Sequence, residues 1–345
     1  MDPRVHERLA GLVDDHPIDV ESRLRRVYVD AAAPRYGRSA VMTAAAAAVA
    51  VALLVLLCTV FLGREGERPV AAPDLRQTIL VAAGDRLLHV DPGEGEITRT
   101  ASTAEVYSPD LSAQGRIVYS QEIDGAHWAV FVADADRSDP RQLTLGSSNA
   151  QDPSWSPDGT KIAFASDRGG NYDIFAMNAD GTGVARLETA NKSQSYHPAW
   201  SPDGGKIAFL RSLGPEGRAW IVWTMNADGS QIVRLPLIAS PDQLAWSPDG
   251  TELAYSNGQD VYVVAANGRG QPVALTGKEG NDVSPAWSPD GTKIAFLSDR
   301  GNETALYAVA AAGGSAVKLA DLPGLLRRMN GIDWGTQPAQ QGAVT

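Results

Sequence analysis

The sequence predicts an all-β protein, a six-bladed β-propeller closed by its C-terminal strand, with a single transmembrane helix and a short helical or disordered segment before it. Three observations indicate this. The stretch Trp155-Ser-Pro-Asp-Gly-Thr-Lys-Ile-Ala-Phe164 begins with Trp-Ser-Pro-Asp-Gly, which returns at Trp200, Trp246 and Trp287, in steps of 45, 46 and 41 residues. An uncharged stretch precedes the repeats, and a lone Trp-bearing strand follows them. Repeats of about 40–50 residues with several short strands are typical of propeller blades.

Each repeat predicts four short antiparallel strands, named a to d here. Ser-Pro-Asp-Gly favours a β-turn, because Pro presets φ, Asp bonds its own backbone and Gly suits the last position. In the copy that begins at Trp155, strand formers alternate over 161–166, and further runs at 172–177 and 184–187 flank the turn 178–181. Such a sheet cannot bury both faces alone, so the copies must stack.

Composition excludes several classes of function. The net charge of −11 argues against a nucleic-acid-binding surface. Cys58 is the single cysteine, so the chain has no internal disulfide and no Cys-based metal site. His89 and His127 lack a spaced partner, and we therefore predict no metal and no cofactor.

Residues 1–39 are predicted to form a cytoplasmic segment. Val5, Leu9, Leu12 and Val13 have helical spacing, which favours a short amphipathic helix. Two interpretations stay open: a partly ordered tail before a membrane anchor, or a docking helix for a cytoplasmic regulator.

Residues 40–63 carry no charge and predict a transmembrane helix. At about 1.5 Å per residue this helix spans roughly 36 Å, enough for a hydrocarbon core of about 30 Å. A cleaved signal peptide and a lipoprotein signal ending at Cys58 are the alternatives; the first would be unusually long, and Leu57 stands where the second needs a small residue. More Arg residues precede the stretch than follow it, which places the N-terminus in the cytoplasm and the repeats outside.

Residues 64–74 are predicted to be a linker, 75–336 the propeller and 337–345 a disordered tail. The runs at 78–82, 85–90 and 96–99 match strands b, c and d, without a strand a before them. Trp334 carries a strand a with nothing after it but the tail, so the two ends of the domain complete one blade and leave no open edge. Tyr107-Ser-Pro-Asp110 is interpreted as a weaker copy of the motif that opens the second blade.

These motifs resemble the repeat of TolB-type (PD40, or WD40-like) β-propellers, over about residues 75–336. The resemblance rests on Trp-Ser-Pro-Asp-Gly-Thr-Lys-Ile-Ala-Phe, on the Ser-Asp-Arg that follows it, and on Asp-Ile-Phe-Ala-Met-Asn-Ala-Asp-Gly. TolB proteins are periplasmic, their propeller binds a peptidoglycan-associated lipoprotein, and an α/β domain precedes it. This chain has a predicted membrane span in place of that domain. What the resemblance implies here is an extracytoplasmic protein-binding platform.

Most motif residues have structural explanations. Trp155, Trp200, Trp246 and Trp287 are predicted to pack between blades, because large aromatics at a repeated strand position fill a core. The Asp of each motif is predicted to be a turn residue. Residues 134–139 are predicted to form a strand c–d turn rather than a calcium loop, because the Gly and distal Glu of an EF-hand are missing.

The mouth of the central channel holds the best candidates for a ligand or partner site. Three residues before each motif aromatic, the six blades place Ala104, Asp152, His197, Gln243, Ser284 and Gly331. Asp152 and His197, flanked by Tyr196 and Trp220, form the candidate site. A polar mouth that holds only water is the alternative.

The b–c and d–a loops share one face of a propeller, and among these repeats their sequences vary most. Binding residues commonly lie on such loops over a rigid scaffold. His127 and Arg168 are the candidates there. For Ser166-Asp167-Arg168 and Ser298-Asp299-Arg300, an Asp–Arg hydrogen-bonded loop and a ligand contact are both open.

No Gly-x-Ser-x-Gly elbow and no HExxH occurs in the chain, and it ends about ten residues after the closing strand, so we expect no enzyme and no catalytic residue. The expected function is a membrane-held platform that binds a protein, a peptide or a cell-wall component. One alternative is a transmembrane signalling protein, a sensor or anti-sigma-like regulator acting through residues 1–39. Another is a hydrolase or lyase at the channel mouth.

Overall fold

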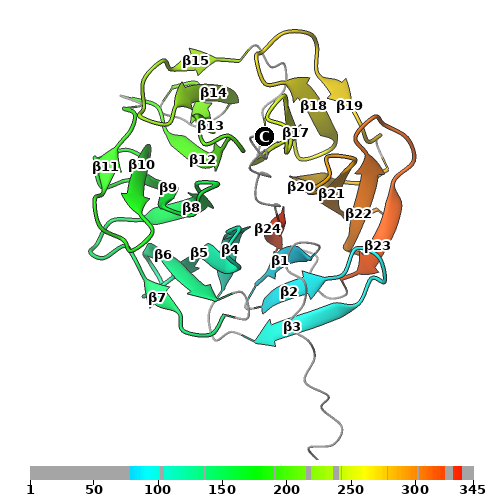
Figure 1. Cartoon of the computed structure of the whole chain (residues 1–345), viewed down its shortest axis with the longest axis horizontal. Helices are drawn as coiled ribbons and strands as arrows, with labels where there is room; N and C mark the ends of the chain where they lie inside the picture. Colours follow the sequence, from blue (N-terminus) through cyan, green and yellow to red (C-terminus); the bar gives the residue numbers. More distant parts are fainter. Residues whose placement is uncertain are drawn as a thin grey trace, which may run out of the picture. The chain divides into compact units, whose positions relative to one another are not determined.

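A computed structural model describes residues 78–335, apart from 85, 102–104, 135–136, 190–191, 215–218, 236–240, 242, 278, 301–302 and 323–328. These residues form six four-stranded antiparallel sheets around a ring (Figure 1). Nothing in this described part is a helix of the length and apolarity that crossing a membrane requires. The predicted segment 1–39, span 40–63, linker 64–74 and tail 337–345 lie outside the described residues.

The first three blades run from innermost to outermost strand as follows. Blade 1 contains β24 (Met329–Trp334), β1 (Ile79–Ala83), β2 (Arg86–Val90) and β3 (Ile97–Ala101). Blade 2 contains β4 (Val106–Leu111), β5 (Arg116–Glu122), β6 (Trp128–Asp134) and β7 (Arg141–Gln142). Blade 3 contains β8 (Ala150–Trp155), β9 (Lys161–Ser166), β10 (Asp173–Asn178) and β11 (Ala185–Arg186).

The other three blades repeat this order. Blade 4 contains β12 (Ser195–Trp200), β13 (Lys206–Ser212), β14 (Trp220–Asn226) and β15 (Val233–Arg234). Blade 5 contains β16 (Gln243–Trp246), β17 (Glu252–Ser256), β18 (Val261–Ala265) and β19 (Val273–Ala274). Blade 6 contains β20 (Asp282–Trp287), β21 (Lys293–Ser298), β22 (Ala305–Ala310) and β23 (Val317–Asp321). The prediction of six blades is confirmed.

The last strand closes the ring, as the sequence predicts. β24 pairs antiparallel with β1, with Ile79 opposite Trp334, Leu80 opposite Asp333 and Val81 opposite Ile332. The chain's two ends therefore share one sheet. This pairing removes the free inner edge that β1 would otherwise present to another chain.

The hydrophobic core lies between neighbouring blades. Trp155 is 6% exposed and packs among Val118, Val130 and Val132 of blade 2. Trp200, Trp287 and Trp334 fill the equivalent places at later junctions. Trp246 is partly buried, and its indole Nε1 donates to the carbonyl of Ala199 at 3.0 Å. The motif Trp residues thus pack between blades, as predicted.

The interpretation of Tyr107-Ser-Pro-Asp110 as a motif copy is wrong by four residues. Leu111, not Tyr107, ends strand a of blade 2, fills the Trp position and packs in the core between blades 1 and 2. The following turn is closed by Gly115, whose backbone nitrogen donates to the carbonyl of Ser112 at 2.9 Å. Ser108 therefore takes the channel position that was assigned to Ala104, which lies outside the described residues. In blade 2 the residues Ser-Pro-Asp lie within strand a, whereas in the other copies they form the turn after it. The local pattern therefore placed the end of strand a four residues too early.

The motif turns are held by their own side chains. Ser156 Oγ donates to Asp158 Oδ1 at 2.6 Å, and the same carboxylate accepts from the backbone nitrogen of Thr160 at 3.0 Å. The Ser156 hydroxyl, followed by that amide, holds the pKa of Asp158 below its ordinary value. Gly159 follows with a φ of 68°, a left-handed conformation that favours glycine. The motif Asp is a turn residue, as predicted.

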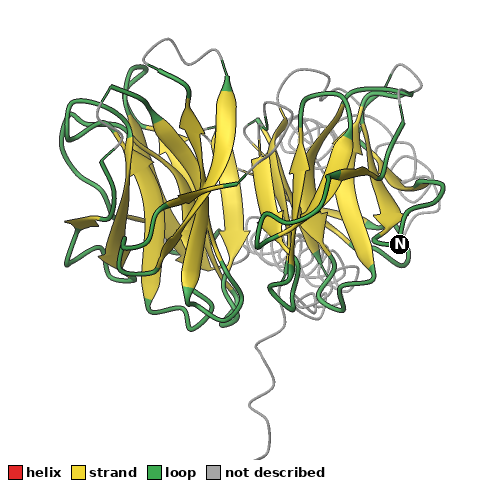
Figure 2. Cartoon of the chain, turned by 90° about the horizontal axis from the view of Figure 1, so that it is seen from above, coloured by secondary structure: helices red, strands yellow, loops and turns green. Residues whose placement is uncertain are grey.

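The strands run between two loop faces (Figure 2). Ala150 at the start of β8 lies opposite Ser166 at the end of β9, which lies opposite Asp173 at the start of β10. The d–a and b–c connections therefore emerge on one face, here called the loop face. The tight a–b and c–d turns occupy the other face.

Candidate functional site

The innermost strands of the six blades surround the centre of the ring (Figure 1). A cavity lies between them and is called the channel here. Its volume is about 410 Å³. Strand a of every blade contributes lining residues, among them Ser108, Asp152, His197, Gln243 and Gly331. Five of the six positions at the predicted mouth, with Ser108 in place of Ala104, thus line one cavity.

Four of the innermost strands carry the same β-bulge. Ser108, Asp152, His197 and Ser284 have φ values of 46°, 51°, 50° and 56°, and each precedes a proline. The pairing register shifts at each of these points. A non-glycine residue in this region costs on the order of 1–3 kcal/mol, and bulges redirect side chains. The bulges therefore set the direction of the side chains at the channel mouth.

Asp152 connects three blades at this mouth. Its Oδ1 accepts a hydrogen bond from Ser108 Oγ at 2.8 Å, and its Oδ2 lies 3.4 Å from His197 Nδ1. Its own backbone nitrogen donates to Ser120 Oγ at 2.9 Å. The Asp152 side chain is 12% exposed and that of His197 is 31% exposed. His197 therefore keeps part of its ring free toward the channel while a carboxylate faces the other side.

An aromatic cluster adjoins His197 on the loop face. The ring of Tyr196 lies 4.5 Å from that of Tyr172, 5.5 Å edge-on from that of Trp220 and 6.5 Å from that of His197. Gln151 Nε2 donates to the hydroxyl of Tyr172 at 2.8 Å. Burial raises the pKa of Tyr172 to about 12 and also raises that of Tyr196, so both hydroxyls stay protonated donors. Amphipathic rings at a partly open mouth suit contacts with a protein partner.

Two carboxylates stand in the channel wall below the mouth. Asp333 Oδ2 accepts from the backbone nitrogen of Leu111 at 2.9 Å, and Asp110 Oδ2 accepts from that of Trp155 at 2.5 Å. Both side chains are partly exposed to the channel, although protein surrounds them. Burial, reinforced by the charge of Asp333, raises the pKa of Asp110 well above its ordinary value, and burial raises that of Asp333 to about 6.

The structure brings some predicted residues together and separates others. Asp152, His197, Tyr196 and Trp220 form one continuous group, and Gln243 lines the same channel. Ser284 is buried, and its neighbour Pro285 lines the channel instead.

The two loop-face candidates lie outside this group. His127 pairs with Asp124, with 2.6 Å between Nδ1 and Oδ2. Arg168 stacks over Phe164, and its Nε donates to Ser166 Oγ at 3.0 Å. Of the two interpretations left open for Ser166-Asp167-Arg168, the Asp–Arg hydrogen-bonded loop is wrong, because Asp167 accepts from Asn149 instead.

Sequence reasoning missed Ser108, Tyr172 and the pair Asp110 and Asp333. Asp110 was interpreted as a turn residue because it follows Ser-Pro. Tyr172 directly precedes strand c at the end of a variable loop, which is the signal that could have found it. Among the described residues no group of three or more His, Cys, Asp or Glu side chains is placed to hold a metal ion.

Fold and channel together define a closed β-propeller protein. The TolB beta propeller domain family, PD40, matches residues 95–237 and 238–322, well over half of the chain. The chain therefore belongs to this family of TolB-type propellers.

Solved structures agree in fold. TolB from Acinetobacter baumannii is similar with a TM-score of 0.63 and 20% identity, over 76% of this chain and 68% of that one. A putative TolB from Agrobacterium tumefaciens is similar with a TM-score of 0.58 and 20% identity, over 71% and 89%. A chain of a nidogen/laminin complex is similar with a TM-score of 0.59 and 12% identity, over 74% and 97%.

Proposed function

We propose that this protein is a non-catalytic platform that binds a segment of another protein, or a peptide of the cell envelope, at the loop face of its propeller. The observation that carries the proposal is the continuous group of Tyr172, Tyr196, Trp220, His197 and Asp152. Binding surfaces are enriched in Tyr and Trp because such rings offer large contact area with a polar end. The similar chain from a nidogen/laminin complex shows that this fold occurs in protein complexes.

Binding is favoured over channel catalysis because the channel carboxylates already have structural roles. Asp333 and Asp110 each accept a hydrogen bond from a backbone nitrogen at a blade junction. A carboxylate that holds two blades together is less free to transfer protons to a substrate. Pairing of Asp152 with Ser108 and His197 restrains the mouth in the same way.

Selection of peptides on the full chain tests the binding function. The detergent-held protein is immobilised and exposed to a phage-displayed library of random twelve-residue peptides. We expect enriched peptides that lose about tenfold or more in affinity on Tyr196→Ala or Trp220→Ala. Trp128→Ala, which removes an aromatic ring from blade 2 instead, is the matched control. Failure to enrich any peptide, or equal loss in all three variants, would refute the proposed site.

We further propose that residues 40–63 hold the propeller outside the cell membrane. The support is the uncharged stretch and the excess of Arg before it. Protease added to intact cells is expected to degrade the repeats. Repeats that survive on intact cells but not in lysed cells would overturn this placement.

A signalling role through residues 1–39 is the second candidate, favoured by the helical spacing of Val5, Leu9, Leu12 and Val13. A synthetic peptide of residues 1–39 is expected to retain a specific cytoplasmic regulator in this case. If the peptide binds no specific partner at micromolar concentration, the signalling role is rejected and the binding platform without a signalling role is kept.

A further inference from the structure

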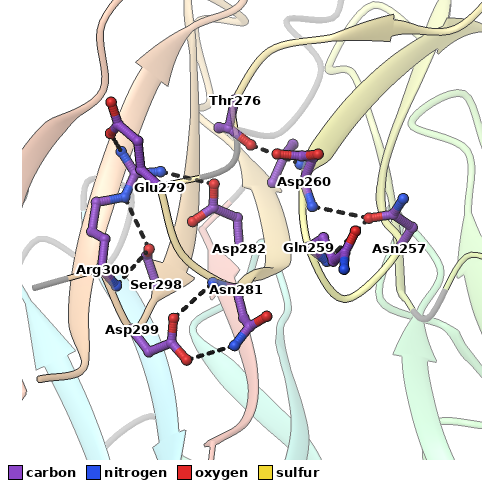
Figure 3. Close-up of polar contacts among 11 residues, drawn as sticks. Asn257, Gln259, Asp260, Thr276, Glu279, Asn281, Asp282, Ser298, Asp299 and Arg300 are labelled. Carbon is purple, nitrogen blue, oxygen red and sulfur yellow. Dashed lines mark hydrogen bonds and ion pairs between the residues drawn. The ribbon is translucent and has the colours of Figure 1, made fainter. Parts of the chain in front are cut away.

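Blades 3 and 6 have the same hydrogen-bonded arrangement on the loop face, where the residue before strand a meets the residue after strand b. Asn281 donates from its backbone nitrogen and from Nδ2 to the carboxylate of Asp299, at 2.7 Å each (Figure 3). In blade 3, Asn149 makes the same two bonds to Asp167, at 2.8 Å each. The two arrangements can therefore be compared residue by residue.

An arginine follows the Asp in both blades and lies in the same way. Arg168 Nε donates to Ser166 Oγ at 3.0 Å, and Arg300 Nε donates to Ser298 Oγ at 3.0 Å. The guanidinium carbon of Arg168 lies 5.1 Å from the ring centre of Phe164, and that of Arg300 lies 5.3 Å from its equivalent in blade 6. Stacking and the Nε bond therefore hold the two guanidinium groups in equivalent positions.

In blade 6 two carboxylates of the chain itself pair with the terminal nitrogens of Arg300, here called its guanidinium fork. Arg300 NH1 donates to Glu279 Oε2 at 3.0 Å, and NH2 donates to Asp282 Oδ2 at 2.8 Å (Figure 3). Glu279 is 74% exposed and comes from the solvent side, whereas Asp282 is fully buried. Blade 4 shows the same preference, because Arg211 pairs with the buried Glu188.

Blade 3 lacks both carboxylates. Ala150 lies opposite Ser166 in the register where Asp282 lies opposite Ser298. Ser147 stands three residues before Ala150, at the place of Glu279. Within the described part of the chain, the terminal nitrogens of Arg168 have no carboxylate at ion-pair distance and no hydrogen-bond acceptor.

Neighbouring charges do not replace the missing pair. Asp167 already accepts a hydrogen bond from Asn149. In blade 6 the equivalent Asp299 is also present, and Arg300 still pairs with the carboxylates of Glu279 and Asp282. Arg186, which lies against Gly169 of the same loop, pairs with Asp173. Burial lowers the pKa of Arg168, although Asp167 opposes this, which is the mark of a desolvated cation that a counter-charge would stabilise.

We propose that Arg168 is a receptor for a carboxylate of the bound peptide, an Asp or Glu side chain that takes the place Glu279 occupies on Arg300. This inference rests on the proposed function and names the partner's chemistry. Arg168 shares its loop with Tyr172 of the aromatic cluster, and Leu145, 80% exposed, stands two residues before Ser147. The site therefore suits an acidic residue next to an apolar or aromatic one.

The test uses peptides selected from the library on the full wild-type chain. These peptides are expected to be enriched in Asp and Glu. Exchange of the acidic residue for its amide, or Arg168→Gln in the protein, is expected to weaken binding about tenfold to hundredfold, with no further loss when both are combined.

A second variant blocks the site without touching the arginine. Ser147→Glu with Ser148→Gly and Ala150→Asp rebuilds the Glu-Gly-Asn-Asp of blade 6, where Gly280 is required because a Cβ there would meet the backbone nitrogen of Arg300 at 2.7 Å. This variant is expected to lose the acidic peptides as Arg168→Gln does. Ser147→Glu alone, at an exposed position, serves if the triple variant does not fold.

The outcomes separate this inference from the function on which it rests. Enrichment of peptides without acidic residues, whose affinity survives Arg168→Gln but falls on Tyr196→Ala, overturns the carboxylate receptor and keeps the platform. If no peptide is enriched on the wild type, the carboxylate receptor and the proposed binding function are both rejected. Arg300→Gln, whose fork is filled internally, is the matched control and is expected to leave peptide affinity unchanged.

Discussion

Asp333, in the closing strand, accepts a 2.9 Å hydrogen bond from the backbone nitrogen of Leu111, which lies 222 residues earlier in the chain. This bond joins blade 1 to blade 2 through the channel wall. Asp110 repeats it one junction further, to the nitrogen of Trp155. In blade 3 Ser154 occupies the place of Asp110, and its Oγ lies 3.4 Å from the nitrogen of Trp200. Polar side chains thus link successive blades on the side where the ring is closed.

The channel carboxylates predict a pH dependence of stability. Their pKa values in the folded protein are raised above the value of about 3.9 of an unfolded Asp, to about 6 for Asp333. The folded state therefore holds more protons on these two groups between these values, and their contribution to the free energy of unfolding falls as the pH rises from about 4 to 6 and above. Asp333→Asn keeps an acceptor for Leu111 and is expected to flatten this slope and add about 1 kcal/mol at pH 7.5. Urea unfolding at pH 5 and pH 7.5 measures both.

Asp249→Asn is the control for that slope, because the hydroxyl of Ser247 and the amide of Thr251 lower the pKa of Asp249. A lowered pKa gives stability that is present above about pH 4 and lost as the pH falls further. This variant is expected to leave the difference between pH 5 and pH 7.5 as in the wild type. Equal slopes in wild type and Asp333→Asn would contradict the assignment.

Removal of the closing strand is expected to prevent stable folding. A chain that stops after Arg328 loses all of β24, including its pairing with β1 and the buried Trp334. A chain that stops after Thr336 keeps them. Thermal unfolding is expected to show a cooperative transition near that of the full chain only for the longer form. A shorter form that melts like the full chain would mean that β24 does not close the ring.

The single substitution Trp334→Ala tests the same junction more gently. The side chain is 6% exposed and packs with Ile79, Val81 and Ala286, so its loss is expected to cost about 3–5 kcal/mol. Trp128→Ala, at a partly exposed position, is expected to cost clearly less. Similar losses of unfolding free energy would argue against a tightly packed closing junction.

Alanine substitutions at two glycines with left-handed backbones distinguish the cost of backbone strain from the cost of a clash with the neighbouring blade. Gly229 has a φ of 84°, and a Cβ there would clash with the carbonyl oxygen of Leu187 in the preceding blade. Gly250 has a φ of 72°, and a Cβ there would meet the ring of Pro202, with Cγ at 3.4 Å and Cδ at 3.6 Å. Gly250→Ala is expected to cost about 1–2 kcal/mol, and Gly229→Ala clearly more, because the turn must move away from its neighbour. Urea unfolding compares them, and equal costs would show that the blades yield at this contact.

Arg168→Gln is expected to leave the fold intact. The side chain makes a hydrogen bond to Ser166 and stacks on Phe164 and Phe175, but it holds no carboxylate of the described chain. Loss of unfolding free energy is expected to stay within about 1 kcal/mol, whereas Arg300→Gln, which strands the buried Asp282, is expected to cost about 2–3 kcal/mol. Thermal unfolding of both variants measures the difference. A larger loss for Arg168→Gln would show that this arginine is structural.

The sequence by itself determined the number of blades, the closing strand and the core position of the motif Trp residues. It could do so because each blade carries its own local signals: the Ser-Pro-Asp-Gly turn after Trp155, Trp200, Trp246 and Trp287, and the alternation after each turn. It also indicated Asp152 and His197, because one repeated offset from the motif points to the channel mouth, and Tyr196 and Trp220 as the aromatic residues that flank them.

Only the tertiary structure decided which residues of different strands meet. Blade 2 lacks the Trp, so its register was set by packing of Leu111 rather than by the local Ser-Pro-Asp. The carboxylates of Asp110 and Asp333 share the channel wall although 223 positions separate them in the sequence. Arg168 and Arg300 follow the same Ser-Asp, and only the neighbouring strand reveals that one is paired and the other is not. Contacts across blade junctions leave no local pattern, because each partner obeys the signals of its own repeat.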